Sequence, residues 1–180
     1  MISLRQTGVL EEFNLAKEVT LLKVIKMFKG AITAIVTPFK EDESLDLDTL
    51  KRLVEFQIKN KIDGIVPCGT TGESPTLDYE EHEKVIETVI EAANGKVQVI
   101  AGTGSNSTKE AIDMTRRAAD AGADASLQVS PYYNKPTQEG LFRHFSAIAS
   151  SVDIPIILYN IKGRTAVNIE TMTLARLQKE

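Results

Sequence analysis

A fivefold alternation of short apolar runs and amphipathic segments is the feature of this sequence that most limits its fold. The apolar runs begin at residues 31, 64, 97, 125 and 154, so successive runs start 28 to 33 residues apart. This spacing is about the length of one βα unit. Most runs are continuously apolar, which is typical of parallel strands buried on both faces. The pattern predicts a parallel sheet with helices packed outside it.

The segments between these runs have helical periodicity and recognisable helix starts. Asp78 and Ser107 are each followed three residues later by glutamate, the spacing of a capping box. In the last helix, we expect Met172, Leu174 and Leu177 to face the core. The residues expected to precede or open the five helices are Asp46, Asp78, Ser107, Thr137 and Asn168.

Two architectures satisfy this alternation, a doubly wound open sheet and a (β/α)₈ TIM barrel. The glycine pair at 102 and 104 lacks the third glycine of a dinucleotide fingerprint, and no Walker A lysine follows Gly69 or Gly72. Polar residues gather instead where the strands end, as in barrel enzymes. We therefore predict an α/β TIM barrel. Since a full barrel has around 250 residues, this chain is expected to be truncated after about five βα units.

The chain divides into residues 1–27 and a partial barrel over residues 28–180. The first segment lacks a signal-peptide pattern, because its apolar positions are scattered and it carries Glu11, Glu12 and Glu18. Two interpretations remain open. The segment is either a helical extension that packs on the domain or a partner, or a stretch that precedes a true start at Met27.

Composition excludes several classes of function. A net charge of −4 provides no basic surface for nucleic acid or anionic membranes. No run approaches the roughly 18 apolar residues of a membrane span. Cys68 is the only cysteine, and His82 and His144 lack metal-ligand spacing, so we expect no disulfide and no metal site. A buried thiol in a cytoplasmic protein is the expected role of Cys68.

The strand ends carry groups that suit acid–base chemistry on a carboxylate. Residues 69–73 (Gly-Thr-Thr-Gly-Glu) place two hydroxyls and backbone N–H groups in one turn. This turn either binds a carboxylate or an oxyanion, or only reverses the chain direction. Three tyrosines also follow or end strands: Tyr132, Tyr133 and Tyr159. They either form a proton relay or pack in the core with their hydroxyl groups in contact with water. Arg164 either clamps a carboxylate or lies on the surface.

Five segments resemble the dihydrodipicolinate synthase family, also called 4-hydroxy-tetrahydrodipicolinate synthases. They are residues 34–39 (AIVTPF), 69–77 (GTTGESPTL), 99–108 (VIAGTGSNST), 130–145 (SPYYNKPTQEGLFRHF) and 158–165 (LYNIKGRT). The resemblance implies a pyruvate-dependent class I aldolase of lysine biosynthesis by the diaminopimelate route. Its substrates would be pyruvate and aspartate semialdehyde, with pyruvate held covalently as a Schiff base and no other cofactor.

The resemblance also implies a role for individual residues. Thr71 would bind the pyruvate carboxylate, and Tyr159 would act in acid–base steps around the Schiff base. Thr70 would link Tyr159 to Tyr133 of a neighbouring subunit, and a homo-oligomer is therefore expected. Arg164 would bind the carboxylate of aspartate semialdehyde.

Lysine is a possible feedback inhibitor by the same resemblance. The positions that resemble the family's lysine site are Ser74, His82, Asn106, Glu110 and Tyr132.

The Schiff-base lysine of the family lies at the end of a sixth strand, whereas this sequence stops at Glu180 in the fifth expected helix. We do not expect Lys135 or Lys162 to replace it. Three alternatives therefore remain beside a synthase whose nucleophile lies outside these residues: an inactive truncated product, a subunit that only associates with others, and another pyruvate-dependent aldolase of the family.

Overall fold

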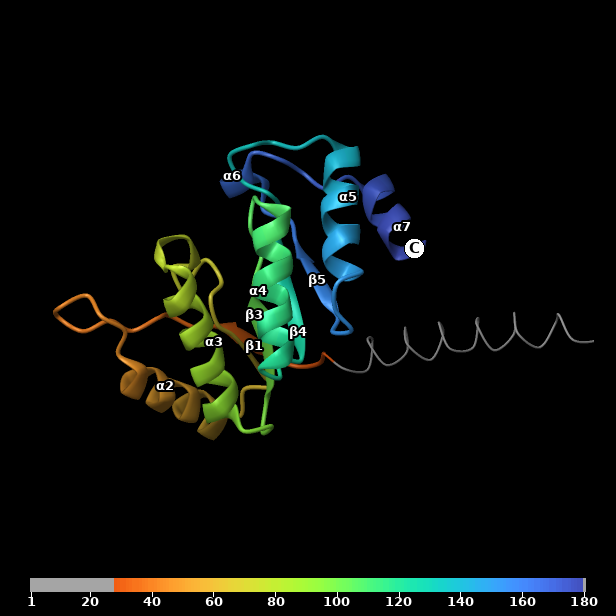
Figure 1. Ribbon diagram of the computed structural model, residues 1–180. Helices are drawn as coiled ribbons and strands as arrows, with labels where there is room; N and C mark the ends of the chain where they lie inside the picture. The colour runs from red at the N-terminus through yellow and green to blue at the C-terminus, as the bar shows by residue number, and fades with distance from the viewer. Residues whose placement is uncertain (1–27, 180) are drawn as a thin grey trace, which may run out of the picture. The chain divides into compact units, whose positions relative to one another are not determined.

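The computed structural model describes residues 28–179, which contain one five-stranded sheet (Figure 1). Every pair of neighbouring strands is parallel, and each strand lies inside one of the predicted apolar runs. The strands are β1 (Ile32–Ala34), β2 (Gly64–Val66), β3 (Gln98–Gly102), β4 (Ala125–Val129) and β5 (Ile156–Tyr159).

The order of the strands distinguishes between the two predicted architectures. They lie in the sheet in chain order, β1-β2-β3-β4-β5. A doubly wound sheet would reverse its order at a switch point, whereas a barrel wall adds each strand beside the previous one. The sequential order therefore confirms the predicted α/β barrel topology for this part of the chain.

The helices follow one another around the sheet in the same sequence. In chain order α2 packs against α3, α3 against α4, α4 against α5, and α5 against α7 (Figure 1). Their bounds are α2 (Leu47–Lys59), α3 (Tyr79–Ala93), α4 (Thr108–Asp120), α5 (Gln138–Ala149), α6 (Lys162–Thr165) and α7 (Thr171–Lys179), with a 3₁₀ turn η1 (Ser74–Thr76).

Four of the five predicted helix starts are confirmed, at Asp46, Asp78, Ser107 and Thr137. The side chain of Asp46 accepts a hydrogen bond from Thr49 N, and that of Thr137 accepts one from Gly140 N. Asp78 forms a complete capping box with Glu81, in which each side chain bonds to the backbone N–H of the other residue. These side chains satisfy N–H groups that the first turn of a helix leaves without partners.

Of the two hydrogen bonds of the capping box predicted at Ser107, only one forms. Ser107 does cap α4, since its hydroxyl accepts from Glu110 N at 3.4 Å. The carboxylate of Glu110, however, accepts from Ser105 Oγ at 2.9 Å rather than from Ser107 N, which instead donates to Ser105 Oγ. The Ser105 hydroxyl is thus the donor to Glu110, in place of the Ser107 backbone N–H.

The last helix begins later than predicted, and of its three apolar residues expected to face the core only Leu177 is partly buried against it. Asn168 does not open it, because α7 starts at Thr171 and a separate four-residue helix, α6, precedes it. Met172 and Leu174 are 73% and 41% exposed, whereas Thr173 is buried. Thr173 donates to Gln138 Oε1 at 2.7 Å, so a polar contact with α5 sets which side of α7 faces inward.

Two apolar clusters fill the space between sheet and helices. The larger joins β1, β2 and β3 to α2 and α3, and the smaller is centred on Leu141, Phe145 and Ile148 of α5. No helix among the described residues is long and apolar enough to cross a membrane. Both interpretations of the N-terminal segment fall on residues outside the described range.

Candidate functional site

A pocket of about 250 Å³ opens at the carboxyl ends of the strands. Five of the predicted site residues line it, and they come from the ends of three strands: Thr70 and Ser74 after β2, Tyr132 after β4, and Tyr159 and Arg164 at the end of β5 and in the α6 that follows it. Catalytic groups of barrel enzymes come from this end of the strands. The remaining lining residues are Cys68, Gly69, Pro75, Gly102, Gly104, Leu127, Val129, Ile161 and Thr165.

Two glycines allow the strand ends to close around this pocket. A Cβ atom at Gly102 would overlap the carbonyl group of Cys68, and one at Gly104 would overlap the backbone N of Val129. Only glycine permits backbones to approach this closely. In the sequence, Gly102 and Gly104 form an incomplete nucleotide motif and belong to the family segment 99–108, whereas no motif marks the apolar wall residues Leu127 and Val129.

The turn after β2 presents two free backbone donors. The N–H groups of Gly72 and Glu73 donate to the carbonyls of Gly69 and Thr70. Those of Thr70 and Thr71 have no acceptor among residues 28–179. The turn is fixed from below, because the buried Thr37 donates from Oγ1 to Gly72 O at 2.7 Å. Adjacent free N–H groups in a tight turn make a concave site for an anion.

Thr71 itself is exposed and is not among the residues that line the pocket. It lies next to Thr70, which is. Thr70 forms no hydrogen bond with Tyr159 within the described part of the chain.

Tyr133 stands apart from the other two tyrosines of the predicted relay. Its side chain is 90% exposed, it does not line the pocket, and its backbone has a φ of 72°. A positive φ is unusual for a residue of this size. The backbone therefore directs this tyrosine away from the site that its own chain forms.

Cys68 lies under the pocket as a buried thiol, as predicted. Burial raises its pKa to about 12, and its Sγ is 3.6 Å from the carbonyl oxygen of His82. A thiol with such a pKa remains protonated at neutral pH and is a poor nucleophile.

Four of the five residues of the predicted lysine site divide between two hollows. Ser74 and Tyr132 line the pocket described above, whereas His82 and Glu110 line a second hollow of about 430 Å³ between α3 and α4. Asn106 lines neither, and its carbonyl accepts from Asn134 Nδ2 at 3.0 Å.

The pKa values of His82 and of Tyr79 are shifted in this second hollow. Burial lowers the pKa of His82, while the Gly102 carbonyl favours its charged form. Glu110 accepts a hydrogen bond from Tyr79, which raises the pKa of that tyrosine. The second hollow therefore combines an anionic acceptor with a histidine held mostly neutral.

Lys135 and Lys162, which we do not expect to replace the Schiff-base lysine, do not line the pocket. Both residues are exposed, and no lysine is among the residues that line this pocket. Within residues 28–179 there is also no group of three or more His, Cys, Asp or Glu side chains that could hold a metal ion.

Comparison with known sequences shows what this chain is similar to. The model of the dihydrodipicolinate synthetase family matches residues 27–180. The 4-hydroxy-tetrahydrodipicolinate synthase of Pelobacter propionicus is 64% identical over 151 residues, and that of Syntrophobacter fumaroxidans is 61% identical over 153 residues. These alignments cover 84% and 85% of this chain and 52% of each relative. The chain thus spans about half the length of the curated relatives it matches.

Solved structures give the same result. The 4-hydroxy-tetrahydrodipicolinate synthase from Methylacidiphilum fumariolicum matches with a TM-score of 0.83 and 54% identity, over 84% of this chain and 50% of that one. The enzyme from Cyanidioschyzon merolae, solved with lysine bound, matches with a TM-score of 0.82 and 46% identity, over 84% and 52%.

Proposed function

Because this chain belongs to the dihydrodipicolinate synthetase family, we propose that it carries substrate-binding residues of a 4-hydroxy-tetrahydrodipicolinate synthase. The reaction is the aldol condensation of pyruvate, bound as a Schiff base to a lysine, with aspartate semialdehyde. It belongs to the diaminopimelate route to lysine, and it needs no cofactor beyond the covalently bound pyruvate. The similarity to named synthases and the pocket at the strand ends support this assignment.

The single observation that carries the proposal is the turn after β2. Its two free N–H groups, at Thr70 and Thr71, lie beside two hydroxyls and next to the pocket. Hydrogen bonds from such donors to a carboxylate are stronger than those between neutral groups. In this proposal Thr71 binds the carboxylate of pyruvate through its hydroxyl and its N–H.

Proton transfer is assigned to Tyr159, Thr70 and Tyr133. Tyr159 and Thr70 line one pocket, so a substrate there would be in reach of both hydroxyls. Tyr133 would come from a neighbouring copy of the chain, and its 90% exposure supports such a role. The functional protein is therefore expected to be a homo-oligomer.

Arg164 is assigned to the carboxylate of aspartate semialdehyde. Arg164 lines the pocket, and its guanidinium makes no ion pair with a residue of the described chain. An arginine without a carboxylate partner is available for bidentate binding of a substrate carboxylate.

The amine that forms the Schiff base is expected on a sixth strand, by analogy with the family. Residues 28–179 contain five strands, and their pocket contains no lysine. Pyruvate should therefore bind to the 180-residue chain without forming an imine. Borohydride reduction in the presence of labelled pyruvate is expected to leave Lys135 and Lys162 unmodified.

Titration with pyruvate tests the carboxylate site directly. In a ¹⁵N-labelled chain, we expect saturable shifts of the Thr70 and Thr71 amide signals, and pyruvamide, which lacks the carboxylate, should cause none. Thr71→Val should weaken binding about tenfold, as expected for loss of one hydrogen bond to a charged group. Thr76→Val is the matched control, because Thr76 is in the next turn and bonds only to Glu73 O. Absence of shifts at Thr70 and Thr71 would contradict the assignment.

Lysine inhibition and a cytoplasmic location are the finer parts of the proposal. The similarity to a synthase solved with lysine bound, together with an acidic hollow that contains Glu110 and His82, supports lysine as a regulator. The single buried thiol is compatible with a reducing compartment.

A further inference from the structure

The segment that carries Arg164 is a loop closed at its base by one asparagine. Asn160 directly follows β5, and its side-chain amide reaches across to the far end of the loop. Its Nδ2 donates to Asn168 Oδ1 at 2.9 Å, and its Oδ1 accepts from Ile169 N at 3.1 Å. The chain thus returns to its starting point after eight residues, which makes residues 160–169 a compact closed loop.

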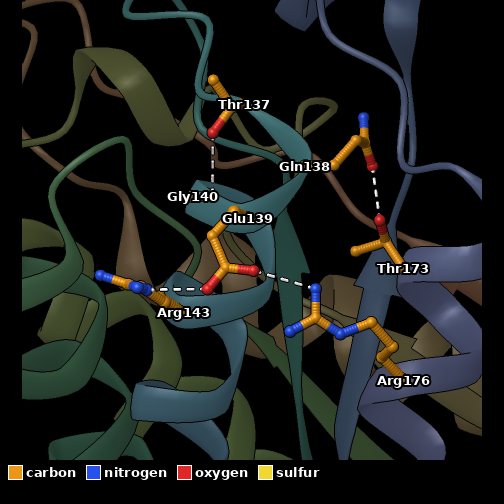
Figure 2. Close-up of polar contacts among 7 residues, drawn as sticks. All are labelled: Thr137, Gln138, Glu139, Gly140, Arg143, Thr173 and Arg176. Atoms are coloured by element: carbon orange, nitrogen blue, oxygen red, sulfur yellow. Dashed lines mark hydrogen bonds and ion pairs between the residues drawn. The ribbon is translucent and has the colours of Figure 1, made fainter.

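A second side-chain amide, from α5, also bonds to the end of this loop. Gln138, the first residue of α5, donates from Nε2 to Asn168 O at 2.7 Å and accepts at Oε1 from Glu170 N at 3.1 Å. Figure 2 shows this side chain pointing from α5 towards Thr173 of α7, with Glu139 bridging Arg143 and Arg176 beside it. Residues 168–170 are therefore held between two side-chain amides.

The interior of the loop is fixed by buried groups. Thr165 is 1% exposed, and its hydroxyl lies 3.1 Å from Ile161 O and 3.0 Å from Val167 O. Val167 and Ile169 are also buried, whereas Arg164 is exposed at the pocket. Arg164 makes no ion pair within the described residues, and its backbone N–H donates to Ile161 O, so its backbone is held by this loop.

We propose that Asn160 and Asn168 are positioning residues for Arg164, so that closure of the loop sets how strongly a substrate carboxylate binds there. The inference rests on the proposed function and deepens it, because it ties the site of the second substrate to an amide pair outside the pocket. Neither asparagine lines the pocket, and both are exposed, so substitutions at these positions leave the apolar core intact.

Substitution of Asn168 tests this arrangement. Asn168→Ala removes the acceptor for Asn160 Nδ2, whereas Asn168→Asp keeps an oxygen in that place. Asn60→Ala is the matched control, because Asn60 is another exposed asparagine whose Nδ2 makes one hydrogen bond of 2.8 Å, at the end of α2. Hydrogen exchange of the amides at 165, 166 and 169 in the 180-residue chain should accelerate about tenfold in Asn168→Ala alone, as expected for local opening.

Carboxylate binding is measured by protection of Arg164 from phenylglyoxal, followed by mass spectrometry, with succinate semialdehyde as the probe. The half-protecting concentration should rise about fivefold in Asn168→Ala, about the effect of one hydrogen bond, and stay within about twofold in Asn168→Asp and Asn60→Ala. Unchanged exchange in the loop, or faster exchange spread evenly over the chain, would overturn the proposal. So would equal protection in wild type and Asn168→Ala.

Failure of the proposed function gives a different pattern. In that case succinate semialdehyde does not protect Arg164 even in the wild-type chain, although loop exchange still depends on Asn168. That result overturns the role of the loop in carboxylate binding together with the function assigned to Arg164.

Discussion

His144 is a buried residue between α4 and α5 whose environment favours the neutral ring. Its Nδ1 lies 2.8 Å from Thr108 Oγ1, and its ring packs edge to face against Phe145 with 5.1 Å between centroids. Its Nε2 is buried without a partner in residues 28–179. A second proton on the ring would place a charge in the core without solvent, and burial accordingly lowers the pKa to about 4.

This histidine should make the protein less stable as the pH falls. Between the unfolded pKa of about 6.5 and the folded value of about 4, the unfolded chain binds a proton that the folded chain does not. The free energy of unfolding therefore decreases with falling pH in that window. At pH 5 we expect His144 to account for about 2 kcal/mol of the loss relative to pH 7.

Denaturant unfolding of His144→Gln at pH 7 and pH 5 measures this contribution, since glutamine does not titrate. The variant should lose less stability than wild type on going to pH 5. Thr108→Val is the control, because it removes the hydrogen-bond partner but keeps the titrating ring. If His144→Gln kept the full pH dependence of wild type, the assignment would be wrong.

At the scale of elements, a buried polar cluster joins α4 to β3 and β4. Gln128 is fully buried, and its Nε2 lies 2.7–2.9 Å from the hydroxyl oxygens of Thr103, Thr115 and Ser126. The three hydroxyl groups are themselves fully buried, and that of Thr103 contacts both others. Removal of one member breaks its hydrogen bonds to the others in a place that water does not reach.

Two threonines allow this effect to be separated from ordinary helix chemistry. Thr115 in α4 and Thr88 in α3 are both buried, and each donates its hydroxyl proton to the carbonyl four residues earlier. Only Thr115 also belongs to the polar cluster. We expect Thr115→Val to lower the free energy of unfolding by about 1–2 kcal/mol more than Thr88→Val does. Equal losses in denaturant unfolding would show that the cluster adds nothing to the stability.

The elements that the sequence predicted well are those with local causes. Apolar runs placed five strands, and Asp78 with Glu81 placed the start of α3 because both partners lie in one turn. The errors arise from contacts distant in the chain. Thr173 is buried on α7 because Gln138, 35 residues away, bonds to it, and no helical periodicity in residues 168–179 contains that information.

The candidate site was predictable to the same degree. Thr70, Tyr132, Tyr159 and Arg164 follow strands, and parallel strands bring their carboxyl ends together, so these residues share one pocket. The separation of Tyr133 from them depends on its φ of 72°, which neighbouring residue types do not predict. The hydrogen bonds that hold residues 168–170 require Asn160 and Gln138 to reach the same segment from different parts of the chain, and no short motif predicts this.

Over the whole described chain, the amino ends and the carboxyl ends of the strands carry different kinds of residue. At the amino ends of the strands, Asp63 accepts from Ala31 N at 2.7 Å and Asp124 accepts from Val99 N at 2.8 Å. Each aspartate thereby ties the start of its strand to the start of the preceding one. Hydroxyl, guanidinium and free N–H groups lie at the opposite end. The division agrees with barrels, in which one face stabilises and the other reacts.

The sheet also has two edges among the described residues, since β1 pairs only with β2 and β5 only with β4. Unpaired N–H and C=O groups along an edge strand are a template for pairing with another chain. Ile32 in β1 is 37% exposed and adds apolar surface there. We therefore expect the 180-residue chain to self-associate, with a mass that rises with concentration in size-exclusion chromatography with light scattering.

Charge at the edge should oppose this association. Ile32→Lys places a solvated ammonium on β1, and natural edge strands use lysine in this way to prevent pairing. We expect association at least about tenfold weaker in this variant. Phe56→Lys is the control, because Phe56 is 57% exposed on the helix α2 and not on an edge strand. If both lysine variants weakened association equally, exposed apolar surface in general, and not the strand edge, would cause the association. A wild-type chain that stayed monomeric at all concentrations would show that the edges are protected in another way.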